Sequence, residues 1–88
     1  MNTVRLSGEL IFARSADLLP LLDQALQGGQ LTLDFQAVTT VDSSAVALLL
    51  AWLRRAQAVQ CQLHCQQLPA SLQQLLAVYG LSHLFRPA

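Results

Sequence analysis

Asp42, Ser43 and Ser44 are consecutive polar residues at the start of the most strongly helical segment of the sequence. The first amides of a helix have no acceptor inside the helix, and the positive end of the helix dipole lies there. Such a position favours a carboxylate, a hydroxyl oxygen or a phosphate group. A single side chain is enough to cap a helix. The triplet therefore predicts either simple capping or a cap that also serves as a polar contact or phosphorylation site.

A second candidate is the helix itself, which we expect from Ser44 to about Val59 because this segment lacks Gly and Pro and is rich in Ala and Leu. Its apolar residues fall into two stripes on roughly opposite sides. One stripe contains Val46, Leu49, Leu50 and Leu53, and the other contains Ala45, Leu48, Ala51 and Trp52. Because a helix in a small two-layer domain buries one side, we expect the first stripe in the core. The second stripe would then form a docking face with Leu48, Trp52 and the cation of Arg55. Alternatively, Trp52 folds over the edge of the domain or meets the last helix near Tyr79.

Other residue types with catalytic or metal-binding chemistry are sparse. His64 lies among glutamines, His83 lies near the end of the chain, and neither has a second ligand at metal spacing. We therefore expect no metal and no cofactor. A hydrolase that uses Ser43 or Ser44 needs a base, an orienting acid and an oxyanion site, and the chain has no Gly-x-Ser-x-Gly motif. Hydrolysis is an alternative class of function, and the expected protein is not an enzyme.

Three short segments alternate between apolar and polar residues, as half-buried strands do. They are residues 3–7, 31–35 and 60–66, and Gly8 is expected to close the first. The second contains Asp34, whose carboxylate is expected to anchor the connection 36–41 or to face solvent. The third places Cys61 and Cys65 on one side about 13 Å apart, which is too far for a disulfide and favours core positions.

Helical periodicity predicts three helices. The first is expected from Leu18 to Leu26, with Asp17 as its cap and Pro20 in the first turn, where the missing amide costs no hydrogen bond. The last has Leu72, Leu75, Leu76 and Tyr79 on one stripe, ends at Gly80 and precedes a tail expected to dock by Leu84 and Phe85. Strands and helices thus alternate, and the connections are long enough to make the strands parallel. The expected fold class is α/β, with a small, mixed or mostly parallel sheet packed against helices.

Composition limits the classes of function. The 88 residues predict one domain, residues 1–88. With 53% hydrophobic and 11% charged residues, the chain carries more apolar surface than so small a core hides, so we expect a protein partner. Zero net charge and scattered arginines argue against nucleic-acid binding. The longest apolar run, Ala45 to Leu53, is about half of a membrane span, and no signal peptide is evident, so the expected location is the cytoplasm.

Leu31–Phe35 and Val41–Leu49 together resemble the signature of the STAS domain, in which a strand ending in Asp precedes a helix that starts with Val-Asp-Ser/Thr-x-Gly-Leu. Leu6–Leu10, Leu18–Leu21 and Leu75–Leu81 further resemble the small STAS subunits of bacterial Mla phospholipid-transport ABC complexes. The similarity runs across nearly the whole chain.

This resemblance implies a non-enzymatic cytoplasmic subunit that binds and regulates or stabilises the ATPase of an ABC transporter. Through that ATPase it contacts the membrane permease, without inserting into the bilayer. Such transporters move phospholipids and maintain the lipid asymmetry of the outer membrane. The hydroxyl residue that matters for contact with the ATPase falls on Ser43, and the residue that is phosphorylated in anti-sigma-factor antagonists, another STAS group, falls on Ser44. The expected partner-binding residues are Asp42, Ser43, Ser44, Leu48, Trp52 and Arg55.

Two features depart from the family pattern. Ala45 replaces the usual glycine, and its methyl group narrows the approach of a kinase or a partner backbone to Ser44. This favours the transporter subunit over the alternative, an anti-sigma-factor antagonist switched by phosphorylation of Ser44, with Ser43 as a second candidate position. The first strand, residues 3–7, matches the family's second strand, so the usual first edge strand is expected to be absent.

Overall fold

The computed structural model describes residues 2–27 and 29–85. These residues form three strands, β1 (Asn2–Leu10), β2 (Gly29–Val41) and β3 (Cys61–Gln66), and three α-helices, α1 (Ser15–Leu18), α2 (Ser44–Ala58) and α3 (Ala70–Val78). Short 3₁₀ turns lie before α1 (η1, Phe12–Arg14), after it (η2, Leu19–Leu22) and near the end of the described chain (η3, Ser82–Leu84). No helix in these ranges has the length and hydropathy needed to cross a membrane.

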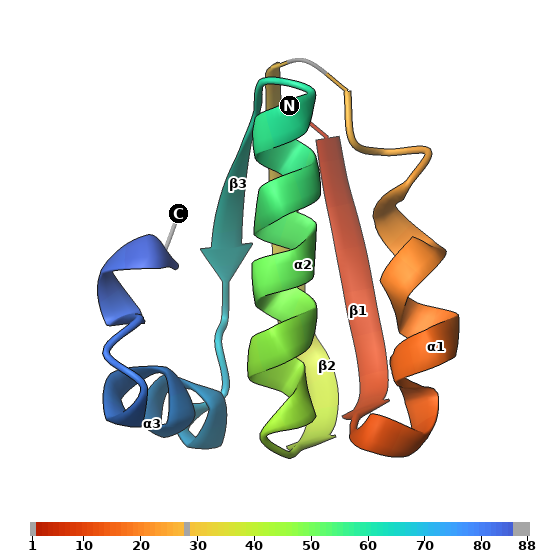
Figure 1. The fold of residues 1–88 in the computed structure, drawn as a ribbon. Helices are drawn as coiled ribbons and strands as arrows, with labels where there is room; N and C mark the ends of the chain where they lie inside the picture. Colours follow the sequence, from red (N-terminus) through yellow and green to blue (C-terminus); the bar gives the residue numbers. More distant parts are fainter. Residues whose placement is uncertain (1, 28, 86–88) are drawn as a thin grey trace.

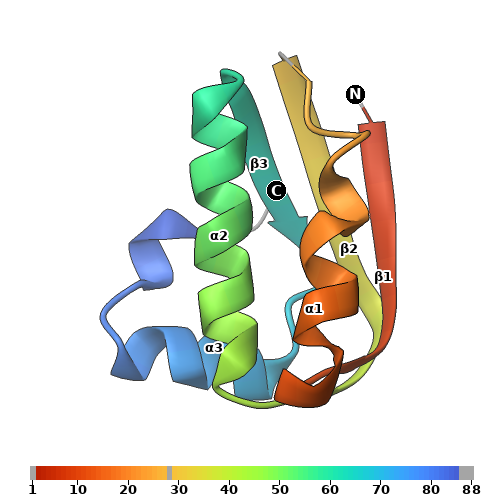
Figure 2. The ribbon, with the colours of Figure 1, turned by 45° about the vertical axis from the view of Figure 1, so that its right-hand side comes forward.

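The three described strands form a parallel sheet in which β2 is central. Figures 1 and 2 show α1 and α2 side by side on one face of this sheet, with α3 beyond the carboxyl end of β3. Parallel strands require the chain to return to its starting end between them, and the two helical connections provide these crossovers. The arrangement confirms the expected α/β class. Within the described residues, β1 forms one edge of the sheet and β3 the other.

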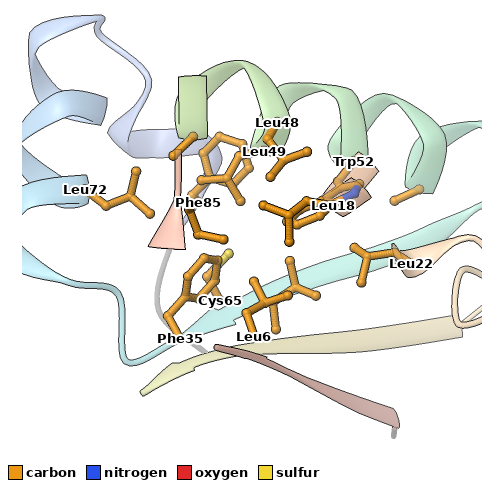
Figure 3. Packing of buried hydrophobic residues seen from close by; sticks show 14 of the residues in the cluster. Leu6, Leu18, Leu22, Phe35, Leu48, Leu49, Trp52, Cys65, Leu72 and Phe85 are labelled. Carbon is orange, nitrogen blue, oxygen red and sulfur yellow. The ribbon is translucent and has the colours of Figure 1, made fainter. Parts of the chain in front are cut away.

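The hydrophobic core lies between the sheet and the helices (Figure 3). Leu31, Leu33 and Phe35 of β2 are buried, as their alternation predicts. The helices and the tail contribute Leu18, Leu22, Leu49, Trp52, Leu72, Leu76 and Phe85. Leu84 is exposed, so the tail docks by Phe85 rather than by both residues.

Both cysteines belong to this core. Cys61 and Cys65 are buried free thiols, in agreement with their predicted positions on one side of a strand. Burial raises the pKa of Cys65 to about 12. A thiol with so high a pKa is not a nucleophile at neutral pH, so Cys65 serves packing.

The first helix differs from the prediction. The α-helix starts at Ser15 and continues after Leu18 as η2, so the predicted start and the predicted cap at Asp17 are wrong. Pro20 then falls inside η2. Because proline has no amide to donate to the carbonyl one helical turn earlier, α-helical hydrogen bonding cannot continue there. Tighter 3₁₀ bonding follows, in which the Asp23 amide donates to the Pro20 carbonyl at 3.0 Å.

The first two strands are longer than predicted. β1 continues past Gly8 to Leu10, and residues 36–41 belong to β2 rather than to a connection. β1 and β2 remain paired as far as Leu10 and Val41, with register shifts between Arg5 and Ser7 and between Gly8 and Glu9. Most side chains in 36–41 are exposed. This segment therefore lacks the alternation of buried apolar and exposed polar residues from which a half-buried strand is predicted.

Candidate functional site

The predicted polar triplet lies where the ends of β1 and β2 meet the starts of α1 and α2, at the lower end of the molecule in Figure 1. β2 ends at Val41 and α2 starts at Ser44, so Asp42 and Ser43 form the whole connection. The Asp42 amide donates to the Leu10 carbonyl at 3.2 Å, which attaches the triplet to the end of β1. In open α/β sheets, ligand sites form beyond the carboxyl ends of the strands. The tertiary structure places the triplet in such a position.

Asp42 connects three parts of this region. Its Oδ1 atom accepts hydrogen bonds from the Ser44 amide at 2.9 Å and from the Ser44 hydroxyl, and its Oδ2 atom accepts one from the Phe12 amide at 3.0 Å. The hydrogen bond from the Ser44 hydroxyl, followed by that from the Phe12 amide, lowers the pKa of Asp42 below its ordinary value of 3.8. Asp42 is therefore ionised at neutral pH, caps α2 and ties this helix to the turn after β1.

The two serines have different environments. Ser44 is half-buried and donates its hydroxyl to Asp42. Ser43 is exposed, and its side chain makes no capping hydrogen bond with any described residue. The capping role predicted for the triplet thus falls on Asp42. Ser44 holds the carboxylate in place, and Ser43 presents its hydroxyl to solvent.

Two hollows flank the start of α2. The larger, of about 520 Å³, takes its polar part from the triplet and its apolar walls from Phe12, Val46, Ala47, Leu50, Tyr79 and Leu81. The smaller, of about 260 Å³, is almost wholly apolar and lies on the α1 side of α2, with Leu19, Leu48 and Ala51 in its lining. Phe12, Ser44 and Ala47 line both hollows, which makes the surface continuous. We name the Phe12–Tyr79 surface after its two aromatic members; it consists of Phe12, Asp42, Ser43, Ser44, Ala47, Leu50 and Tyr79.

Phe12 and Tyr79 are candidate functional residues that sequence reasoning missed. Phe12 is 79% exposed in η1, and Tyr79, predicted on the buried stripe of the last helix, is 55% exposed. Tyr79 directly follows α3, which ends at Val78, and its amide still donates to the Leu75 carbonyl at 3.1 Å, so the ring lies at the exposed end of that stripe. Exposed aromatic side chains beside a hollow are typical of surfaces that contact a partner. The sequence gives only a weak signal for Phe12 and Tyr79, because each is a single aromatic residue near the end of a strand or a helix.

The prediction that Leu48 and Trp52 form an exposed docking face is wrong, whereas the Arg55 side chain is 41% exposed. Leu48 is buried, and Trp52 is 0% exposed with its Nε1 donating to the Leu19 carbonyl at 3.0 Å. Arg55 donates to the same carbonyl at 3.2 Å and pairs with Asp23 at 2.7 Å. The reason is that α1 and η2 pack against this side of α2. Both apolar stripes of α2 are therefore largely enclosed, one by the sheet and one by the first helical segment.

Arg14 fixes the turn that carries Phe12. Its Nη1 atom donates to the Glu9 carbonyl at 2.7 Å and to the Ser7 carbonyl at 3.3 Å. Gly8, between these two residues, has a φ of 76°, and a Cβ there would lie 3.0 Å from the Arg14 Nη1 atom. The backbone conformation therefore favours glycine at this position, and a Cβ would force the end of the Arg14 side chain to shift.

The remaining polar candidates lie elsewhere. Asp34 is 4% exposed, accepts the Gln36 amide at 2.9 Å and lies 3.6 Å from the Arg5 Nε atom. It holds the backbone of β2, which is close to the anchoring role predicted for it. His64 and His83 are outside the lining of both hollows. Within residues 2–27 and 29–85, no group of three metal-ligating side chains is found.

Known proteins give two points of similarity. Residues 2–86 match the model of the family described as MlaB, STAS domain. Among solved structures, the chain is similar to the anti-sigma factor antagonist SpoIIAA in its unphosphorylated form, with 21% sequence identity and a TM-score of 0.76, over 98% of this chain and 77% of that chain. No curated protein matches the sequence. At this identity the structural likeness shows the fold, whereas the family match extends over nearly the whole sequence, and the chain therefore belongs to the MlaB-type family of STAS domains.

Proposed function

We propose that this protein is a non-catalytic subunit that binds the ATPase of an ABC phospholipid transporter, and through it the permease, on the cytoplasmic side of the inner membrane. In this role it regulates or stabilises the ATPase and contributes to outer-membrane lipid asymmetry. Membership of the MlaB-type family supports this class of partner. The observation that carries the proposed site is the Phe12–Tyr79 surface, where two exposed aromatic residues and the exposed Ser43 hydroxyl accompany an ionised Asp42.

The composition of this surface suits a protein partner. Aromatic side chains contribute strongly to binding free energy when a partner removes them from water. Phe12 and Tyr79 are distant in sequence but line the same hollow, and Ala47 and Leu50 add apolar area from α2. The Ser43 hydroxyl is both a donor and an acceptor, so it orients a partner rather than adding much affinity. An apolar centre with a few polar groups is the usual composition of a protein interface.

Co-purification of the tagged protein from membranes tests this proposal. Ala47 and Ala58 are both exposed on α2 and lie towards opposite ends of the helix. Ala47→Glu places a charge within the Phe12–Tyr79 surface, and Ala58→Glu is the matched control. We expect the wild type and Ala58→Glu to recover an ABC ATPase with its permease, identified by mass spectrometry. Ala47→Glu is expected to reduce this recovery about tenfold or more, because the longer side chain occupies the hollow and the partner would have to desolvate a second carboxylate beside Asp42.

Each arm of this experiment can contradict a different part of the proposal. Equal recovery by both glutamate variants, with unchanged circular dichroism spectra, would place the interface elsewhere on the molecule. Failure of the wild type to recover any ABC ATPase would contradict the function itself. Trp52→Glu is unsuitable here, because this side chain is enclosed in the core.

One observation favours a second function, that of an anti-sigma-factor antagonist: the similarity of fold to SpoIIAA. Under this hypothesis a kinase phosphorylates Ser44. The Ser44 hydroxyl is half-buried and donates to the Asp42 carboxylate, so a phosphate there would meet an existing negative charge. Incubation with an anti-sigma kinase and ATP separates the two functions, because only the antagonist is expected to take up stoichiometric phosphate at Ser44.

A further inference from the structure

We propose that the larger hollow of the Phe12–Tyr79 surface binds the guanidinium group of an arginine side chain supplied by the protein partner. The inference rests on the proposed function for the identity of that partner, and it specifies the chemistry that the partner brings. It is carried by a juxtaposition of one carboxylate, two exposed aromatic rings and two serine side chains around a hollow of about 520 Å³.

The charge of the hollow selects a cation. Among the described residues that line it, Asp42 is the only one that carries a charge at neutral pH. Arg5, Arg14 and Arg55 are engaged with carboxylates or carbonyl oxygens elsewhere. Arg54 lies roughly 15 Å along α2 from the start of the helix. The described part of the chain therefore offers this carboxylate no cationic side chain. The amino end of α2 supplies only about half a unit of positive charge, so the hollow keeps a net negative charge.

The carboxylate also has acceptor capacity left. A carboxylate accepts about four hydrogen bonds. The Asp42 Oδ1 atom accepts two from Ser44, whereas the Oδ2 atom accepts one, from the Phe12 amide. A guanidinium group carries five N–H donors in a planar fork. It can therefore form a charge-assisted hydrogen bond to Oδ2 and keep donors for the exposed hydroxyl oxygen of Ser43.

The aromatic rings favour arginine over lysine. Phe12 and Tyr79 come from η1 and from the end of α3, so a side chain that enters the hollow meets aromatic rings from two elements. A cation close to an aromatic face is stabilised by the ring. The guanidinium is planar and weakly hydrated and stacks on such faces, whereas an ammonium is a strongly hydrated point charge. A neutral apolar side chain would instead remove water from Asp42 without replacing its hydrogen bonds, which is unfavourable.

Titration of the ¹⁵N-labelled protein with capped amino acids tests this inference through amide chemical shifts. The probes are the N-acetyl methylamides of arginine, lysine and citrulline, because citrulline has nearly the shape of arginine without its charge. We expect saturable shifts at Phe12, Ser44 and Tyr79 with arginine, and dissociation constants about fivefold higher or more for citrulline and about twofold or more for lysine. Tyr79→Leu is expected to weaken arginine binding about two- to fivefold. Val78→Leu, at an exposed neighbour outside the hollow, is the matched control and is expected to leave binding unchanged.

Equal binding of the arginine and citrulline probes overturns the inference, as does a lysine probe that binds as tightly as arginine. Arginine binding that survives both Tyr79→Leu and Asp42→Asn also overturns it. Asp42→Asn keeps an oxygen acceptor for the Ser44 amide, so it separates the charge from the helix cap.

The titration with capped amino acids and the co-purification from membranes can fail independently of each other. If the wild type recovers the ABC ATPase but its hollow does not prefer arginine, the inference fails and the proposed function stands. If the hollow prefers arginine and no ABC ATPase is recovered, the proposed function fails.

Discussion

The first turns of α2 and its later turns both carry residues that the sequence proposes for partner binding, yet their environments are opposite. At the start, Ser43 and Ala47 are exposed beside Phe12. Further along, Trp52 is enclosed and Arg55 is bonded to η2 and to the residue after it. The difference lies in the neighbours, because α1 and η2 cover the later turns, whereas the start of α2 reaches the end of the sheet.

Residue type alone is therefore a poor guide to the interface of so small a protein. Trp and Arg are enriched at binding hot spots, but here they hold the first helical segment to α2. A small domain has a thin stability margin, and an indole offers a large area to bury together with an N–H that needs an acceptor. The Leu19 carbonyl supplies that acceptor at 3.0 Å. The exposed aromatic residues come instead from the ends of β1 and α3.

The largest expected effect is a difference in unfolding free energy between a variant of the later turns of α2 and a variant of the Phe12–Tyr79 surface. Trp52→Ala is expected to lower the free energy of unfolding by about 3–5 kcal/mol, because it leaves a cavity in the core. Phe12→Ala is expected to change it by less than about 0.5 kcal/mol, because the ring is mostly exposed. Urea unfolding followed by circular dichroism measures both values. Similar losses of unfolding free energy in the two variants would contradict the burial of Trp52 and make it a candidate interface residue again.

The second effect concerns the turn that carries Phe12. Gly8 and Gly80 have φ values of 76° and 70°, and a left-handed conformation costs a non-glycine residue about 1–2 kcal/mol. A Cβ at Gly8 would also lie 3.0 Å from Arg14, whereas one at Gly80 meets no described atom within 4 Å. We expect both alanine variants to be less stable, Gly8→Ala the more so, and only Gly8→Ala to shift the Phe12 amide resonance. Equal losses of stability and an unchanged Phe12 resonance would show that the Arg14 contact does not hold the turn.

The smallest expected effect is the pH dependence contributed by Asp42. Its folded-state pKa is lowered from 3.8 by hydrogen bonds from the Ser44 hydroxyl and the Phe12 amide. The unfolded chain therefore binds more protons in this range, so the contribution to stability is present above pH 3.8 and is lost as the pH falls through the lower, folded pKa. The difference in urea midpoint between the wild type and Asp42→Asn is expected to narrow from about pH 5 to about pH 3. A constant difference would show that these hydrogen bonds are absent in solution.

Prediction from the sequence succeeded where local periodicity is strong. The helix start at Ser44 and the burial of Leu31, Leu33 and Phe35 were predicted and are confirmed. The alternating polar residues Thr32 and Asp34 are buried as well, so this part of β2 is covered on both faces rather than half-buried. Prediction failed where the pattern is weak or where two interpretations of one residue compete. Pro20 was predicted in the first turn of a helix, whereas the structure has an earlier helix start at Ser15 and Pro20 in a 3₁₀ segment.

Local sequence patterns were enough to predict the order of strands and helices, the parallel α/β class and the position of the polar triplet at a helix start. These follow from hydrogen bonding and apolar spacing within single segments, which are local properties of the chain. Three-dimensional packing was needed to show that Asp42 also holds the Phe12 amide, that Trp52 is enclosed, and that Phe12 and Tyr79 share one hollow. Each of these depends on which distant segments pack side by side, and the pattern of one helix or strand does not identify the neighbour that will cover it.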